Sequence, residues 1–109
     1  ASIRAYDESG LRATICVGYA DRGGLVYPPA DEVGFLASLP AEVQALIGAG
    51  KSGYLPLAET IGLMARLRAD YAGHPRLSFA SGPAGPQWVS DEAWRALAAE
   101  RASAARAPR

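Results

Sequence analysis

The fold of this chain is decided by residues 43–53, VQALIGAGKSG, which imitate two nucleotide-binding loops. Residues 48–53 fit the pattern G-x-G-x-x-G, and they also carry the Gly-Lys-Ser end of a phosphate-binding loop through Lys51, the only lysine. Both motifs require a strand that leads in and a helix that begins at once, because the free N–H groups of that helix then face the phosphate. A strand at 43–47 would therefore predict a parallel dinucleotide-binding sheet, and a helix there would make the glycines a helix stop.

The segment before the glycines has the pattern of a helix. Pro40 suits the first helical position, and Val43, Leu46 and Ile47 share one apolar stripe. The opening glycine of a phosphate-binding loop is also missing, because its place is occupied by Ala45. The sequence therefore predicts a helix that ends in glycines, and it predicts no nucleotide and no other cofactor.

The first 28 residues alternate β-rich segments with turn-forming clusters. The β-rich segments are residues 3–6, 11–19 and 25–27, and the turns are residues 7–10 and 21–24. Three strands joined by short turns predict an antiparallel meander. A glycine inside the middle segment, Gly18, predicts a bulge or a close approach of another group to the backbone.

Helical periodicity dominates the rest of the chain. A short helix is predicted from Asp31 to Leu39, before the one that Pro40 begins. The strongest pattern consists of five apolar residues spaced three or four apart: Leu57, Ile61, Met64, Leu67 and Tyr71. It predicts a helix over 56–72. Residues 76–80 alternate like a half-buried strand, and Ser90 suits the N-cap of a last helix.

Strands grouped first and helices later predict an α+β fold. We expect a three-stranded antiparallel meander, with residues 76–80 as a possible fourth strand, packed against three or four helices. Residues 1–102 would form one domain, and the Ala- and Arg-rich residues 103–109 would fray. Self-association is compatible with this fold, because one face of such a sheet has no helix to cover it.

Composition narrows the function classes. The eleven basic and eleven acidic residues give zero formal net charge, which argues against a nucleic-acid partner. No apolar run reaches the roughly 18 residues of a membrane-spanning helix, so no membrane is expected. The abundance of Arg, Ala, Gly and Pro suggests a GC-rich bacterial genome, and we expect a cytoplasmic protein.

Candidates for chemistry are few. One histidine, one cysteine and scattered carboxylates predict no metal site. His74 lies at the end of a predicted helix, where it is either a helix-terminal cation or an acid–base group. Arg68 and His74, with five residues between them, resemble in spacing the Arg–His pair of the HEPN ribonucleases, from whose all-helical domain the predicted strands depart.

Aromatic residues suggest a different role. Tyr19, Tyr27 and Tyr54 adjoin the glycine-rich connections, and Trp88 precedes the last helix. These residues and Arg22 are of the types that anchor protein interfaces. The aromatic ones more often cap the edge of a core, with the hydroxyl or indole N–H in water.

Two functional hypotheses follow. The first is a small non-catalytic protein that recognises another protein, as an adaptor, an immunity protein or a regulatory subunit does. The second is a small cofactor-independent enzyme or ligand-binding domain that uses Lys51, Arg68, Asp70, His74 and a tyrosine. The candidate binding residues are the following: Tyr19, Arg22, Lys51, Tyr54, Arg68, His74 and Trp88.

Overall fold

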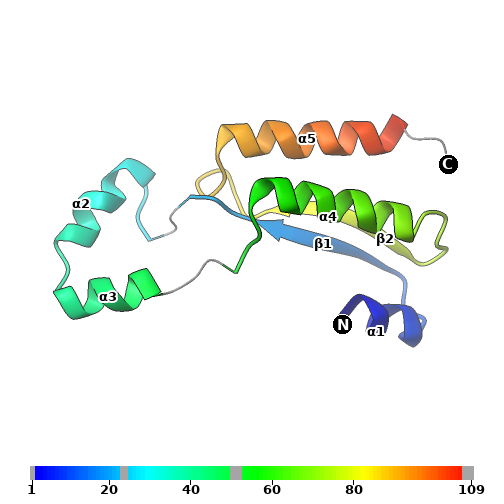
Figure 1. The fold of residues 1–109 in the computed structure, drawn as a ribbon, viewed down its shortest axis with the longest axis horizontal. Coiled ribbons are helices and arrows are strands. Elements are labelled where there is room, and N and C mark those ends of the chain that lie inside the picture. The colour runs from blue at the N-terminus through cyan, green and yellow to red at the C-terminus, as the bar shows by residue number, and fades with distance from the viewer. Residues whose placement is uncertain (1, 23–24, 50–52, 107–109) are drawn as a thin grey trace.

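The computed structural model describes residues 2–22, 25–49 and 53–106. Within them the elements follow in the order α1 (Ser2–Ser9), β1 (Ala13–Tyr19), η1 (Pro29–Asp31), α2 (Glu32–Ala37), α3 (Ala41–Ala49), α4 (Leu57–Asp70), β2 (Leu77–Pro83) and α5 (Asp91–Arg106). Figure 1 shows that they form two unequal parts. We call α1, β1, α4, β2 and α5 the body, and residues 25–49 the arm.

The body is built on two parallel strands. β1 pairs with β2 in a register that runs from Ala13 opposite Leu77 to Tyr19 opposite Pro83. α4 lies between the two strands in sequence, so it provides the crossover that parallel pairing requires. α4 and α5 pack against each other and against the sheet. Together they cover one of its two faces (Figure 1).

The core lies between this sheet face and the helices. One cluster of buried residues comprises Tyr19, Val89, Ala93 and Leu97. The other comprises Met64, Leu67 and Phe79, with Ile3, Ile15, Val17, Leu63 and Tyr71 packed around it. The buried members of both clusters belong to the body or to the loop before α5, and none belongs to the arm.

Several helix and strand predictions are confirmed. The helix predicted over 56–72 is α4, and the strand predicted at 76–80 is part of β2. α4 ends before Gly73, whose φ of +73° is a left-handed conformation that glycine adopts without strain. Ser90 begins α5, because its Oγ accepts the N–H of Ala93 at 3.2 Å.

The predicted antiparallel meander is wrong, and its first strand is a helix. Residues 3–6 lie in α1, where Arg4 forms an ion pair with Glu8 one turn later at 2.7 Å. α1 is held from outside by Ile3, which packs on the core, and by Asp7, which bonds to the segment before β2. A short apolar alternation does not separate helix from strand, so these tertiary contacts decide the conformation.

The third strand of the meander is also absent. Residues 25–27 form bends in which Leu25 donates its N–H to Glu32 at 2.9 Å and Tyr27 is 77% exposed. Pro28 and Pro29 follow, and proline cannot donate to a strand ladder. The middle segment, β1, pairs instead with β2, a strand about sixty residues further along the chain.

The arm gives the molecule its elongated shape. The radius of gyration is 17.5 Å, against about 13 Å for a compact domain of about 100 residues. In Figure 1 the arm, with η1, α2 and α3, extends from the end of β1 away from the body. The extensive contacts between elements join members of the body, or join η1 to α2.

The segment that decides the fold is helical. Residues 43–47 lie within α3, so the predicted helix before the glycines is confirmed. Lys51 and the centre of the glycine loop lie outside the described residues. At the other end of the chain, the tail predicted to fray is helical as far as Arg106, and residues 107–109 lie outside the described part.

Candidate functional site

The arm exposes an unusual amount of apolar surface. It is less than a quarter of the chain, yet it supplies half of the large apolar side chains that are exposed in the described residues. Its exposed apolar residues are Leu25, Tyr27, Val33, Phe35, Val43 and Leu46, and of these Val33 and Leu46 are 78% and 75% exposed. Exposed apolar surface concentrated in one segment is typical of an interaction site.

Local contacts hold the shape of the arm. The side chain of Gln44 donates to the carbonyl oxygen of Leu39 at 2.8 Å, and the Ser38 hydroxyl donates to that of Phe35 at 2.6 Å. Leu36, Leu39 and Ile47 are only half-buried. α2 has no buried residue, so its helical form depends on short-range bonds and not on a core.

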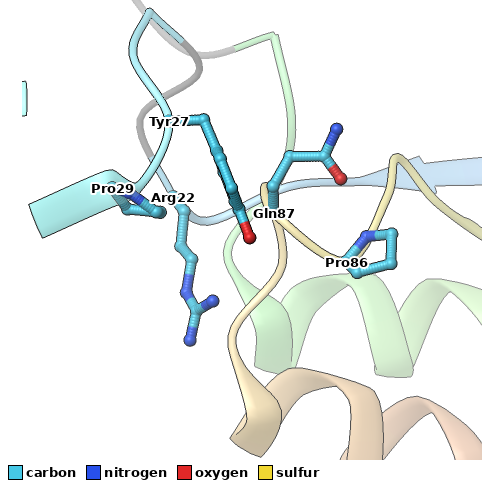
Figure 2. A pocket seen from close by; sticks show the side chains of 5 residues that line it. All are labelled: Arg22, Tyr27, Pro29, Pro86 and Gln87. Carbon is cyan, nitrogen blue, oxygen red and sulfur yellow. The ribbon is translucent and has the colours of Figure 1, made fainter.

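A depression of about 390 Å³ lies where the arm leaves the body. Tyr27 and Pro29 line it from the arm, Arg22 from the end of the first described segment, and Pro86 and Gln87 from the loop before α5. In Figure 2 the ring of Tyr27 reaches from the arm toward Gln87. The apolar surface of the arm therefore continues to the edge of the body.

Asp21 fixes this edge of the body. Its carboxylate accepts the backbone N–H of Ser90 at 2.7 Å and the Ser90 hydroxyl at 2.6 Å. Although burial acts to raise it, these hydrogen bonds hold the pKa of Asp21 below its ordinary value. Burial, and then the charge of Asp21, raise the pKa of Tyr19. The backbone N–H groups of Asp21 and Arg22 both donate to the carbonyl oxygen of Trp88.

The sheet face away from α4 and α5 has small side chains and little cover. We call this the uncovered face: Thr14, Cys16, Gly18, Ser78, Ala80 and Gly82. The hydroxyls of Thr14 and Ser78 share a hydrogen bond of 2.8 Å across the strands, and Cys16 is exposed. Tyr54 lies over one end, because a Cβ on Gly18 would lie 2.9 Å from its ring, so the close approach predicted at Gly18 is confirmed.

The other end of the uncovered face is basic. A depression of about 340 Å³ is lined there by Arg12, Thr14, Arg76 and Ser78, together with His74 and its neighbours. Arg12 donates to the carbonyl oxygen of Pro75 at 3.1 Å, and Arg76 forms an ion pair with Asp7 at 3.2 Å. The buried Nε of Arg76 has no hydrogen-bond partner among the described residues.

His74 is a structural link between α1 and β2. The N–H groups of Arg76 and Leu77 donate to its Nδ1 at 3.1 and 3.0 Å, so this nitrogen carries no proton. The proton therefore lies on Nε2, which donates to Asp7 at 2.9 Å. With both nitrogens engaged, neither is left to take a proton from a bound molecule.

The structure does not bring the predicted site residues together. Tyr19 is buried in the core, 4% exposed. Arg68 donates to Glu100 at 2.8 Å and to the carbonyl oxygen of Phe79 at 2.9 Å, which joins α4, α5 and β2. Arg22 and Trp88 lie at the root of the arm, and His74 lies by the basic depression.

Sequence reasoning missed the residues that characterise the basic end of the uncovered face and the apolar surface of the arm. Arg12 and Arg76 flank β1 and β2, and their alignment follows from the parallel register, which the meander hypothesis concealed. The exposure of Val33 and Leu46 was also not predicted, because a sequence period shows which residues share a face and not whether that face is covered.

The described residues contain neither a cluster of metal ligands nor a membrane-spanning helix. No three side chains among their His, Cys, Asp and Glu residues gather closely enough to hold a metal ion. In the same part of the chain, no helix has both the length and the apolar character that crossing a bilayer requires.

Comparison of the chain with protein-family models, with curated proteins and with solved structures found no match.

Proposed function

We propose that this chain is a protein-binding module that acts through its arm. The observation that carries the proposal is the exposure of Val33, Phe35 and Leu46 on helices that no element of the body covers. Each large aliphatic side chain gains about 1.5–3 kcal/mol when it passes from water into a fully buried site. A partner that covers the arm would recover this free energy, which the folded monomer leaves unused.

The root of the arm supports the same function. Tyr27, Pro29 and Pro86 offer ring surfaces around a shallow depression, and Arg22 adds a guanidinium group at its rim. Aromatic residues and arginine contribute disproportionately to protein interfaces. The rigid ties between Asp21, Ser90 and Trp88 hold this rim in place before any partner arrives, so that little ordering entropy is lost on binding.

A capture experiment with matched variants tests the proposal. The tagged chain is incubated with a lysate of cells that make it naturally, beside Leu46→Glu in the arm and Ala98→Glu on the exposed surface of α5. We expect the unchanged chain and Ala98→Glu to retain the same protein in stoichiometric amount, and Leu46→Glu to lose it. Equal retention by both variants would contradict the proposal, provided that circular dichroism shows both to be folded.

A second candidate function is the binding of a small anion at the basic depression. It is favoured by the two guanidinium groups of Arg12 and Arg76 and by the buried Nε that lacks a partner among the described residues. Calorimetric titration with inorganic phosphate tests it. Saturable binding that Arg12→Ala weakens and that Arg4→Ala leaves unchanged would support this candidate, and heats no larger than those of dilution would exclude it.

A further inference from the structure

We infer that the partner of the arm is a second copy of this chain, whose uncovered face the arm covers. The inference rests on the proposed function and names its partner. Three features of the described residues support it: the open face of the sheet, the exposed apolar area of the arm and the distribution of charge.

The sheet lacks a cover that its type requires. Parallel sheets occur almost only where both faces are buried, and a sheet of two strands also has two unprotected edges. Here α4 and α5 cover one face, while Thr14, Cys16 and Ser78 on the other are exposed. Because the side chains on this face are small, a helix can approach the strands closely. The uncovered face of the body is therefore a suitable docking surface for a helical segment.

The arm is a helical segment whose apolar side chains lack a packing surface among the described residues. Its two exposed aromatic side chains are of about 150–250 Å² each, and with its four exposed aliphatic side chains they leave on the order of 600 Å² of apolar area in water. An interface of standard size buries about 800 Å² on each partner. Since each copy would contribute an arm and also an uncovered face, the two contacts together would reach that size.

Charge favours pairing between unlike parts of two copies. The arm carries Asp31, Glu32 and Glu42 and no basic residue. Because the whole chain has zero formal net charge, the remainder carries an excess of three positive charges. Arg12 and Arg76 lie at the uncovered face; among the described residues the only carboxylate paired with either of them is Asp7, which bonds to Arg76 and is shared with His74. An acidic arm on a basic sheet face is therefore electrostatically complementary.

A second copy would cover both the open sheet face and the apolar surface of the arm in a single symmetric contact. When the arm of each copy lies on the uncovered face of the other, the contact is repeated by a two-fold axis and the assembly closes as a dimer. An unrelated partner would have to supply both a surface for the arm and a separate cover for the sheet. The exchange also keeps each arm extended from its own body, as Figure 1 shows it.

The test combines oligomeric state with the reactivity of the single cysteine. Sedimentation equilibrium and thiol labelling of Cys16 are measured on the purified full chain over a range of concentrations, for the unchanged chain, Leu46→Glu and Ala98→Glu. We expect the unchanged chain and Ala98→Glu to form dimers in which Cys16 labelling slows at least tenfold as concentration rises. Leu46→Glu is expected to stay monomeric, with fast labelling at every concentration.

Added salt should weaken the dimer, because the arm and the sheet face carry opposite charge. We expect Arg12→Glu, which removes one positive charge and adds a negative one at the sheet face, to raise the dissociation constant at least tenfold at low salt. Ala98→Glu adds one negative charge elsewhere and should change the dissociation constant less than twofold. A dimer that is indifferent both to Leu46→Glu and to Arg12→Glu, with Cys16 still reactive, would overturn the inference.

Two other outcomes separate this inference from the proposed function. A chain that is monomeric throughout, labels fast at Cys16 and still captures a different protein through Leu46 would overturn the inference and leave the proposed function standing. A monomer in which Cys16 is slow to label at all concentrations, and becomes fast in Leu46→Glu, would show the arm folded onto its own sheet. That result would contradict both.

Discussion

The body and the arm both contain helices with large apolar side chains, yet only in the body do these side chains form a core. In α4, Met64 and Leu67 face Phe79 and are almost fully buried. In α3, Leu46 has the same kind of position within an apolar stripe and is 75% exposed. Apolar side chains along a helix therefore favour burial, but whether they are buried depends on a packing surface from another part of the molecule.

Electrostatic contacts divide in the same way. In the body, Arg68 joins α4 to α5 through a carboxylate, Glu100, whose side chain is only 7% exposed, and joins α4 to β2 through the carbonyl oxygen of Phe79. The charged residues of the arm, by contrast, make one described contact of this kind within it, between Glu32 and the backbone of Leu25. Substitutions in the two parts should therefore have very different effects on the free energy of unfolding of the monomer.

The largest effect is expected for Arg68→Ala. Without the guanidinium group, the buried carboxylate of Glu100 and the carbonyl oxygen of Phe79 lose their partner. We expect the free energy of unfolding, measured by urea denaturation, to fall by about 3–5 kcal/mol. Arg4→Ala is the matched control, because it breaks the exposed ion pair with Glu8 and should cost less than about 1 kcal/mol. Equal losses would contradict the bridging role of Arg68.

Next is the pair of substitutions Met64→Ala and Leu46→Ala. Met64 is fully buried, so its truncation leaves a cavity and should lower the free energy of unfolding by about 2–5 kcal/mol. Leu46 has no core to leave, so its truncation should change the stability of the dilute monomer by less than about 0.5 kcal/mol. Denaturation curves at low protein concentration measure both. A loss at Leu46 as large as that at Met64 would remove the distinction between arm and body.

A smaller effect on the free energy of unfolding is expected when Asp21 is protonated at low pH. Because the folded state lowers the pKa of Asp21, its carboxylate stabilises the fold above the ordinary value of 3.8, and this contribution is lost as pH falls through the lower folded pKa. Asp21 is exposed and its interactions are screened by solvent, so we expect about 1 kcal/mol or less. Thermal melts of the unchanged chain and of Asp21→Asn should therefore differ at neutral pH and converge below that range. A difference that grows on acidification would contradict this assignment.

The sequence predicted those parts of the fold that depend on neighbouring residues. The spacing of Leu57, Met64 and Leu67 predicted α4 within a few residues, and Ser90 with the acidic residues after it predicted the start of α5. The apolar stripe of Val43, Leu46 and Ile47 correctly indicated a helix and not a nucleotide-binding strand, although Gly48, predicted to stop that helix, lies inside α3. In each case the interaction that decides the structure spans four residues or fewer.

Pairing over long distances could not be predicted in this way. β1 joins β2 across the whole arm and α4, and no local pattern records that the two strands run parallel. The order strand, helix, strand around α4 was a signal for parallel pairing, but the turn-forming clusters near residues 7–10 and 21–24 outweighed it. α1 formed where a strand was predicted, because Asp7 finds its partners in His74 and Arg76, far away in sequence.

The candidate site was less predictable than the fold. Interface-type residues were proposed at the glycine-rich connections, and of these Arg22 and Trp88 lie at the root of the arm while Tyr19 is buried. Val33 and Phe35 in α2 and Leu46 in α3 are apolar helix residues of the types that fill cores, so their exposure appears only in three dimensions. Charge offered a signal that composition alone hides, since three acidic and no basic residues fall within 25–49.

Hydrogen exchange resolved by segment can show whether the arm packs on its own body, because it measures the amide protection of every helix in one dilute sample. The account predicts that the amides of α2 and α3 exchange at least a hundredfold faster than those of α4, since local opening of the arm disrupts no core. It also predicts that the protection of α2 and α3 rises with protein concentration. Protection of α2 and α3 equal to that of α4 in the dilute monomer would show that the arm is already packed on its own chain, and would contradict the account.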